Sequence, residues 1–460
     1  MGQPGGLRPF TRLRNYQAGP AQLLIGGASS IILLGTILLV LPQASASGHS
    51  IGLVDALFTS VSAVCVTGLI VLDTPNDFTT FGHVVLLFLF QVGGLGYMTS
   101  ATFVAVVLGK RMGLRNRLVL KEAMASPTME GLARLAVLTV KVTLVVEVLT
   151  ALFLTLHFIG VMPVGRALWF GLFHSVSAFN NAGFALFTDS LSVFQGDPLA
   201  TVPLAFTIIL GATGILVISD LSHRLRGDVS RLSLHTRLTL SMMLVVGGVG
   251  AACIFFLERG AGASMEGAGA LDGIGVALFQ SFASRTAGFA TMDVSLMAPA
   301  TLFLLILLML IGGASGSAAG GIKVSTCGVI LASLWSTLRG REQVNLFHRT
   351  VPHSIIQKSF FLAFAALFLL VGATWVVLAL EGTRFMPTIF EVASAVGTVG
   401  LSVGDGTGRS FCAQFGDSGK LLIALCMFIG RLGPLTIGIA VLRSDYQKRY
   451  RLPEEKVLIG

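Results

Sequence analysis

Four short segments of this chain repeat one pattern, and they constrain its fold more than any other feature. Each has a glycine that is preceded by an alanine five positions earlier and followed directly by leucine or phenylalanine. Four matches in register, each between two long apolar runs, indicate internal repeats. The segments read ALFTSVSAVCVTGLIV, GLFHSVSAFNNAGFAL, ALFQSFASRTAGFATM and TIFEVASAVGTVGLSV. The aligned glycines are Gly68, Gly183, Gly288 and Gly400, and ten positions earlier stand Phe58, Phe173, Leu278 and Phe390.

Eight apolar runs flank these segments, two for each repeat. Each is close to the roughly 20 residues that a bilayer crossing needs. Only 12% of the residues are charged, about half the share that is usual in a soluble domain. The sequence therefore predicts an all-α polytopic membrane protein with eight transmembrane passes. The runs lie near 20–41, 84–108, 136–161, 200–218, 237–257, 300–338, 356–380 and 419–442.

The order within each repeat predicts a pore. A first pass (M1), a short pore helix with its glycine segment, and a second pass (M2) follow one another. Because two passes return the chain to the same side, successive repeats are parallel and related by an axis along the membrane normal. We expect four parallel repeats around a central pore with pseudo-fourfold symmetry. The expected units are a cytosolic arm at 1–19, repeat 1 at 20–109, repeat 2 at 110–219, repeat 3 at 220–340, repeat 4 at 341–445 and a cytosolic tail at 446–460.

The distribution of basic residues indicates the orientation. Twenty-two of the 31 Lys and Arg residues fall in five short clusters at the ends of the chain and in alternate connections. Cytoplasmic connections carry such an excess, so we expect both termini in the cytosol. The net charge of +9 is explained by these clusters, and nothing beyond charge suggests nucleic acid. The basic connections suit a protein partner or anionic membrane lipid.

The glycine segments predict a selectivity filter made of backbone oxygens. Irregular backbone at membrane depth occurs where it lines a cavity or is buried in protein, and rings of carbonyl oxygens replace the hydration shell of a cation. The segments lack carboxylates, so we expect a monovalent cation, with the Arg285 side chain turned away from the axis. The expected ion-binding residues are Val66, Thr67, Gly68, Asn181, Ala182, Gly183, Thr286, Ala287, Gly288, Thr398, Val399 and Gly400.

Two features of the later passes stand out. The run IGGASGSAAGGIK interrupts the sixth pass, and its five glycines favour local unwinding because each costs a helix about 1 kcal/mol. The alternative is close packing of helices through small residues. Arg431 lies within another apolar run, where a charge is expensive and either functional or paired. The residues concerned are Gly312, Gly313, Gly316, Gly320, Gly321, Lys323 and Arg431.

Motifs for catalysis are absent from the sequence. It contains no HExxH zinc motif, and SVGD at 402–405 lacks the first glycine of an intramembrane aspartate motif. The five cysteines are scattered and suggest neither disulfides nor a zinc site. We therefore expect a protein that is not an enzyme, binds no cofactor and holds no metal other than a monovalent cation.

The chain resembles the Trk/Ktr/HKT superfamily of potassium transporters, in particular the membrane subunit of Ktr-type systems. The resemblance covers nearly all of residues 15–445. Glycine at all four filter positions goes with potassium preference in that family, and the short stretch before the first pass favours Ktr over Trk. The motifs that carry it are VTGL followed by DT, QVGGLGYMT (91–99), GGASGSAAGGIK (312–323) and GRLGPLT (430–436).

This resemblance implies a mechanism and partners. Residues 311–322 would form an intramembrane gate loop under the filter, with Arg431 facing the pore nearby and Lys323 capping the loop. It also implies potassium uptake across a bacterial inner membrane, a homodimer, and a cytosolic RCK-type ring. That ring would bind the regulatory nucleotide, and sodium would act as an activator. The alternative is a Trk-type or less selective sodium/potassium pathway.

Overall fold

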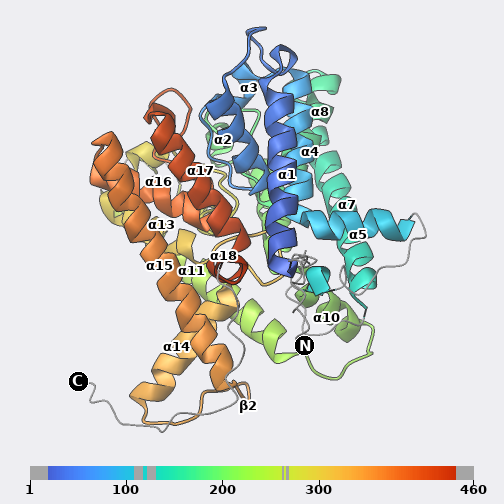
Figure 1. Ribbon diagram of the computed structural model, residues 1–460, viewed down its shortest axis with the longest axis vertical. Helices are drawn as coiled ribbons and strands as arrows, with labels where there is room; N and C mark the ends of the chain where they lie inside the picture. The colour runs from blue at the N-terminus through green and yellow to red at the C-terminus, as the bar shows by residue number, and fades with distance from the viewer. Residues whose placement is uncertain (1–18, 108–117, 122–130, 262–263, 266–268, 442–460) are drawn as a thin grey trace, which may run out of the picture.

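The computed structural model describes residues 19–107, 118–121, 131–261, 264–265 and 269–441. Most of the predicted N-terminal arm and the whole predicted tail lie outside these residues. The described part is mostly helical, with one short antiparallel hairpin that pairs β1 (Asn345–Leu346) with β2 (Arg349–Thr350) (Figure 1). The all-α class expected from the sequence is confirmed.

Within each predicted repeat range, a long helix comes first, a short helix second and a broken helical segment third. We keep the names M1, pore helix and M2 for these three elements. The first repeat contains α1 (Pro20–Val40), α2 (Leu53–Val64), α3 (Thr74–Asp77), α4 (Thr80–Leu95) and α5 (Tyr97–Val107). The second contains α7 (Leu132–Phe158), α8 (Val164–Asn180), α9 (Pro198–Thr213) and α10 (Ile215–Leu225). The third contains α11 (Leu234–Ala261), α12 (Ala270–Ala283), α13 (Pro299–Leu310) and α14 (Val324–Leu338). The fourth contains α15 (His353–Glu381), α16 (Phe385–Gly397), α17 (Asp417–Leu432) and α18 (Pro434–Val441). Short 3-10 turns are η1 (Pro42–Ala44), η2 (Ser192–Phe194), η3 (Val294–Leu296) and η4 (Phe411–Gln414).

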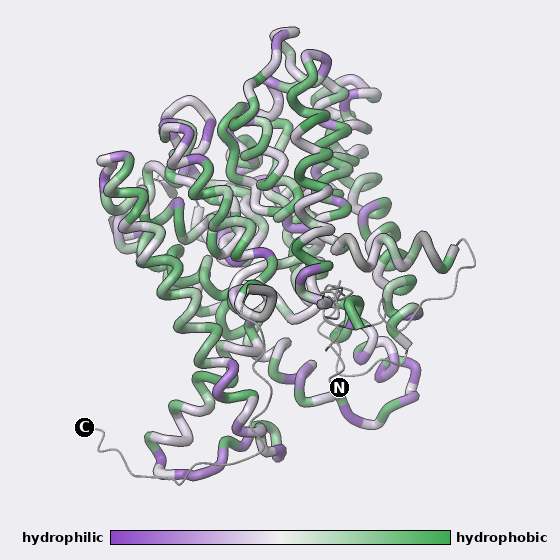
Figure 2. The backbone as a smooth tube through the Cα atoms, viewed as in Figure 1, coloured by the Kyte–Doolittle hydropathy of each residue, from purple (hydrophilic) through white to green (hydrophobic). Residues whose placement is uncertain are grey.

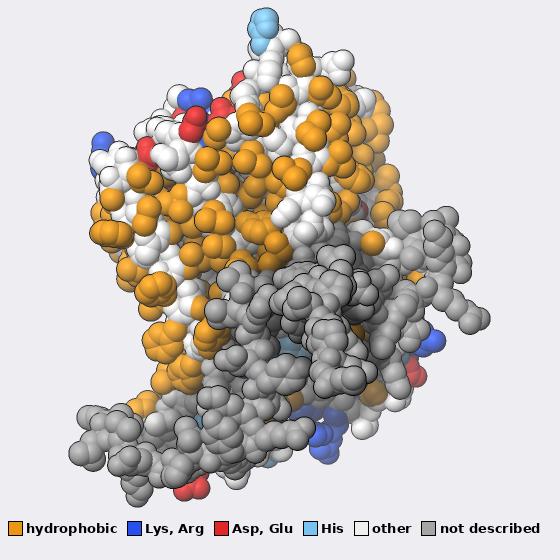
Figure 3. Space-filling model, viewed as in Figure 1, with side chains coloured by type: hydrophobic (Ala, Val, Ile, Leu, Met, Phe, Trp, Pro, Cys, Tyr) orange, Lys and Arg blue, Asp and Glu red, His pale blue; other side chains and the backbone are white. Residues whose placement is uncertain are grey.

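Apolar surface covers the helices that face outward. The M1 helices α1, α7, α11 and α15 are each long and apolar enough to cross a membrane, and the bent pair α9–α10 makes a fifth candidate. Hydrophobic side chains dominate the upper part of the visible face, and charged side chains gather at its upper left edge (Figure 3). The backbone trace shows the same helices as mostly hydrophobic (Figure 2). These helices show a membrane protein with several spans, and the count of eight passes stays a prediction.

Every M2 pass is broken in the structure, whereas the sequence analysis expected a break in the sixth pass alone. The breaks follow α4 at Gly96, α9 at Gly214 and α17 at Gly433, where φ is 77°, 80° and 82°. At Gly214 the chain turns by 98°. Only glycine adopts such backbone angles without a steric penalty. In the third repeat, residues 311–323 separate α13 from α14, which agrees with local unwinding of the small-residue run.

The pore helices are buried, and one residue of the sequence alignment needs correction. Phe58, Phe173, Phe279 and Phe390 are all at most 3% exposed. Leu278, which the ungapped alignment placed with them, is 40% exposed. The stretch from this phenylalanine to the aligned glycine is therefore one residue shorter in repeat 3 than in the others.

In three repeats a glycine of M2 allows the M2 helix to pack closely against the end of the pore helix. A Cβ atom on Gly93, Gly211 or Gly430 would meet the backbone oxygen of Val64, Phe179 or Val396, respectively. Each of these oxygens lies at or near the last turn of a pore helix. The close contact places the M2 break beside the start of the glycine segment.

Replacing Gly430 by alanine should destabilise the protein. The added methyl group would meet the Val396 oxygen, the Val396 carbonyl carbon at 3.0 Å and Thr398 Cγ2 at 3.2 Å. Such overpacking costs about 1–3 kcal/mol, so the thermal unfolding temperature in detergent should fall. Gly26→Ala is the control, because nothing lies within 4 Å of its Cβ position, and its unfolding temperature should stay or rise. Equal behaviour of the two variants would contradict the close packing.

Candidate functional site

The four aligned glycines lie together in a closed ring. A Cβ atom on Gly68 would lie 3.0 Å from Gly183 Cα, and one on Gly183 would lie 3.3 Å from Gly288 Cα. A Cβ atom on Gly288 would lie 3.0 Å from Gly400 Cα, and one on Gly400 would lie 3.0 Å from Gly68 Cα. Segments more than 100 residues apart thus meet around one axis, in the order of the repeats.

Backbone carbonyl groups crowd this ring. Each Cβ position also meets the oxygen of the residue before the next glycine: Ala182, Ala287, Val399 and Thr67 in turn. All four glycines have φ between 69° and 99°, so a side chain there would be strained as well as crowded. The twelve residues predicted to bind the ion are thereby brought together in four neighbouring stretches, which we call the filter segments: Val66–Gly68, Asn181–Gly183, Thr286–Gly288 and Thr398–Gly400.

Three pore helices end in the same way. Val66, Asn181 and Thr398 adopt left-handed backbone angles, with φ of 56°, 57° and 50°. The next residue in each case donates its amide hydrogen to the serine carbonyl five positions earlier, at 2.8 Å. This is the pattern of a helix that closes on a left-handed residue. For β-branched Val66 and Thr398 the conformation costs about 1–3 kcal/mol, and such strain is typical of functional sites.

The ends of the pore helices make the ring attractive to cations. Helices α2, α8, α12 and α16 end three to five residues before their filter glycine, so their C-terminal ends approach the ring. The C-terminus of a helix carries about half a negative charge. Carbonyl oxygens and helix ends together favour a cation without any carboxylate. The described residues contain no group of three or more His, Cys, Asp and Glu side chains placed to hold a metal ion.

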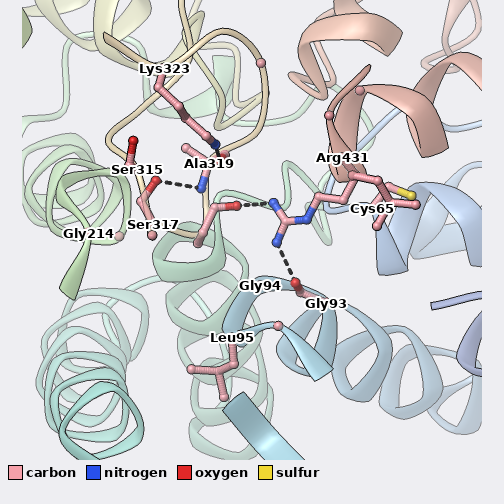
Figure 4. Close-up of a pocket in the computed structure, with 18 of the residues that line it drawn as sticks. Cys65, Gly93, Gly94, Leu95, Gly214, Ser315, Ser317, Ala319, Lys323 and Arg431 are labelled. Atoms are coloured by element: carbon pink, nitrogen blue, oxygen red, sulfur yellow. Dashed lines mark hydrogen bonds between the residues drawn. The ribbon is translucent and has the colours of Figure 1, made fainter. Parts of the chain in front are cut away.

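A cavity of about 450 Å³ lies next to the filter segments. It reaches the ends of the pore helices at Val64, Phe179 and Val396, and it is lined by M2 residues of all four repeats. Residues 315–319 and 321–323 of the third M2 form another part of its wall (Figure 4). The stretch 311–323, which we call the M2 loop, therefore projects into this space.

The M2 loop is anchored to the break in the second M2. The amides of Ala314 and Ala318 donate to the carbonyl oxygens of Ala212 (2.9 Å) and Gly211 (3.2 Å). The Gly312 amide donates to Ile322 O at 2.8 Å, which closes the loop on itself. A Cβ atom on Gly320 would meet the Thr398 hydroxyl of the fourth filter segment. The loop thus lies against the filter, and it needs glycine at this contact.

Arg431 and Lys323 hold the loop from the cavity side (Figure 4). Arg431 donates to the carbonyl oxygens of Ala318 in the loop and Gly93 in the first M2. Lys323 Nζ donates to Ala319 O at 2.6 Å. Among the described residues that line the cavity, these two are charged and none is acidic. Both basic side chains therefore lie in the wall of this cavity, each bonded to the M2 loop.

Arg285 does not line this cavity. Its guanidinium carbon lies 4.7 Å from the centre of the Phe282 ring, and the side chain is only 3% exposed. A guanidinium stacked on an aromatic face is stabilised by a cation–π interaction. The side chain packs against its own pore helix.

The structure shows a polar cluster between the first and second repeats. Glu147 of α7 is 4% exposed. It accepts hydrogen bonds from Asn180 Nδ2 at 3.1 Å and Gln91 Nε2 at 3.3 Å. Asn180 directly precedes the second filter segment. A lone glutamate in a long apolar run was the one signal available, since buried charges in such runs are normally paired or functional.

His174 is a structural histidine with both ring nitrogens hydrogen-bonded. Its Nδ1 lies 2.8 Å from Phe170 O, and its Nε2 accepts a hydrogen bond from the Leu186 amide at 3.2 Å. Leu186 stands three residues after Gly183. The histidine therefore holds the chain where it leaves the second filter segment.

Three comparisons with known proteins agree with this architecture. The family model of the TrkH cation transport proteins matches residues 27–450. The chain is 35% identical to "Ktr system potassium uptake protein B" of Bacillus subtilis, over 96% of this chain and 97% of the relative. It is 37% identical to the protein of the same name from Vibrio alginolyticus, over 96% of both chains.

Two further relatives extend the comparison. "Potassium/sodium uptake protein NtpJ" of Enterococcus hirae is 34% identical over 96% of this chain and 97% of its own length. The crystal structure of the potassium transporter TrkH from Vibrio parahaemolyticus matches with a TM-score of 0.74. It shares 18% identity, over 95% of this chain and 87% of that one, and therefore supports the fold alone.

Proposed function

This chain belongs to the TrkH family of cation transport proteins, and we propose that it is the membrane subunit of a potassium uptake system. The observation that carries the proposal is the closed ring of four glycines with its crowded carbonyl oxygens. Relatives named as potassium uptake proteins at 35% and 37% identity support potassium as the ion. Members of such a transporter family are not enzymes.

The path of the ion follows from the arrangement of the site. A potassium ion loses water at the outer side and is coordinated by backbone oxygens of the filter segments. The negative ends of the pore helices stabilise its charge. Below the filter, the M2 loop and the charges of Arg431 and Lys323 close the path. Uptake therefore requires the loop to move away from Thr398 and Arg431 to release Ala318.

The proposal also includes the oligomeric state, the regulatory partner and the membrane in which the protein lies. The chain forms a homodimer in the bacterial inner membrane, with both termini in the cytosol. A cytosolic RCK-type ring binds the regulatory nucleotide, and sodium acts as an activator. Helices α5, α10, α14 and α18 follow the breaks in the M2 passes, and those breaks line the cavity. A ring that binds these helices could therefore change the shape of the cavity by moving them. The name "Ktr system" of the relatives supports a complex of several components.

A second candidate is a less selective sodium/potassium pathway. The third filter segment lacks the left-handed residue that the other three share, so the ring departs from fourfold symmetry. The relative from Enterococcus hirae is named a potassium/sodium uptake protein. Both observations fit a filter with weaker discrimination between the two ions.

Uptake into proteoliposomes distinguishes these functions. The purified chain should carry potassium into vesicles with an inside-negative potential, and tenfold excess sodium should compete weakly. Empty vesicles and vesicles with a neutral solute are the controls. Equal competition by sodium would favour the second candidate. A monodisperse protein that carries neither ion, with and without its cytosolic partner, would contradict both.

A further inference from the structure

Three filter segments are held by a serine of their own pore helix. Ser62 Oγ accepts from the Gly68 amide at 3.1 Å, and Ser394 Oγ accepts from the Gly400 amide at 2.9 Å. Ser177 Oγ donates to Phe184 O at 2.8 Å. Each serine stands six residues before its filter glycine. The hydroxyl therefore fixes the backbone whose carbonyl groups point toward the ring.

The third filter segment has no such serine. With the one-residue shortening taken into account, Ala283 occupies the place of Ser62. The amides of Ala287 and Gly288 both donate to Ala283 O, at 2.8 and 3.2 Å. A methyl side chain offers no hydrogen bond to the strand that follows. This segment is therefore the one of the four that its own pore helix holds by backbone bonds alone.

A serine of the neighbouring repeat supplies the side-chain hydrogen bond that the third filter segment lacks. The Ala290 amide, two residues after Gly288, donates to Ser190 Oγ at 3.2 Å. The Ala290 carbonyl accepts from the Leu191 amide at 3.0 Å. Together these two bonds clip the exit of the third filter segment to the loop after the second. Ser190 has φ of 56°, an uncommon conformation for a residue with a side chain.

The first filter segment has a similar clip from the fourth repeat, in which one serine supplies both groups. The Ile70 amide, two residues after Gly68, donates to Ser410 Oγ at 2.9 Å. The Ile70 carbonyl accepts from the Ser410 amide at 3.0 Å. Ser410 is 4% exposed, so water does not replace this bond easily.

The second and fourth segments are held differently, from within their own repeats. His174 accepts from the Leu186 amide, as described above. Glu391 occupies the equivalent position of α16, directly after the buried phenylalanine, and accepts from Ser402 Oγ at 2.7 Å and from the Cys412 amide at 3.0 Å. The support behind the ring thus has twofold rather than fourfold symmetry.

We propose that Ser190 and Ser410 are positioning residues for ion selection, each holding the exit of a filter segment that belongs to the next repeat. The inference rests on the proposed ion pathway. Ser190 carries more of this role, because the third segment has no serine of its own, whereas Ser62 still holds the first. Loss of Ser190 therefore frees the carbonyl groups of Ala287 and Gly288 to change their distance from the ion.

Hydrogen exchange tests the clip without reference to transport. Ser190→Gly removes the hydroxyl, and glycine adopts the φ of 56° without steric penalty. Any faster exchange in this variant therefore does not come from added backbone strain. Exchange of the peptide around 286–292 should become about fivefold faster, the effect expected for one lost hydrogen bond. Ser410→Ala should act likewise on the peptide around 68–72. Unchanged exchange in both variants would overturn the clip even if the chain carried no potassium.

Competitive uptake tests the consequence for selection. In Ser190→Gly the preference for potassium over sodium should fall severalfold while total cation flux persists, and Ser410→Ala should lose less. Ser410→Thr keeps a hydroxyl and should restore the native preference. Ser192→Ala is the matched control, since among the described residues this hydroxyl bonds to Asp189 O of the same loop and to no filter segment. Faster exchange in Ser190→Gly with unchanged preference would overturn the positioning role.

Discussion

Gly68→Ser should lose most of the preference for potassium over sodium. The new Cβ atom would lie 2.6 Å from Ala182 O, an oxygen that we place on the ion path, so this oxygen must shift relative to the ion. A difference of about 1.4 kcal/mol between the two ions corresponds to a tenfold change in preference. We expect a loss of about this size from the displaced oxygen, measured by competitive uptake into proteoliposomes. The φ of 91° adds strain for any residue with a side chain, which lowers stability rather than preference.

Gly52→Ser separates backbone strain from crowding. Gly52 precedes α2 in the same repeat and has φ of 87°, almost the same as Gly68, yet nothing lies within 4 Å of its Cβ position. This variant should suffer a similar strain and keep its ion preference. If Gly68→Ser folds and selects ions as the native chain does, the ring of glycines is a packing device. If both variants lose preference alike, the effect comes from strain in the pore-helix loop.

The repeated segments were the strongest signal in the sequence, because the ring needs glycine at four places. Backbone that approaches backbone this closely leaves no space for a side chain, so the residue type is dictated by geometry. The same reasoning failed by one residue in repeat 3. An alignment on the glycines without a gap placed Leu278 with the buried phenylalanines, whereas Phe279 packs there. A missing residue in a loop leaves no trace in residue types.

The sequence did not predict the breaks at Gly96, Gly214 and Gly433, and the reason is physical. A single glycine lowers helix stability by only about 1 kcal/mol, and apolar runs contain many glycines that stay helical, such as Gly26 in α1. What distinguishes the broken positions is a tertiary contact three residues earlier, against the end of a pore helix. The Ser410–Ile70 contact was equally hidden, since 340 residues separate its partners and no periodicity connects them.

Arg431→Ala should raise potassium influx and make it less dependent on any activating partner. The native guanidinium donates to Ala318 O in the M2 loop and to Gly93 O in the first M2, and so it ties the loop to the opposite wall. Hydrogen bonds to charged groups contribute about 1.5–3 kcal/mol. Losing them shifts the closed loop toward an open state by about tenfold or more, which initial rates of potassium uptake would reveal.

Two further variants distinguish electrostatic repulsion by the basic side chains from the hydrogen bonds of Arg431 as the cause of the closed path. Lys323→Gln removes a charge from the same cavity but leaves the bonds of Arg431 in place, so its influx should rise less. Arg384→Ala removes an exposed arginine before α16 and should leave influx unchanged. If Arg431→Ala lowers influx in a monodisperse protein, the arginine supports the open path. If Lys323→Gln opens the path as far, electrostatic repulsion rather than the tie to the loop holds it shut.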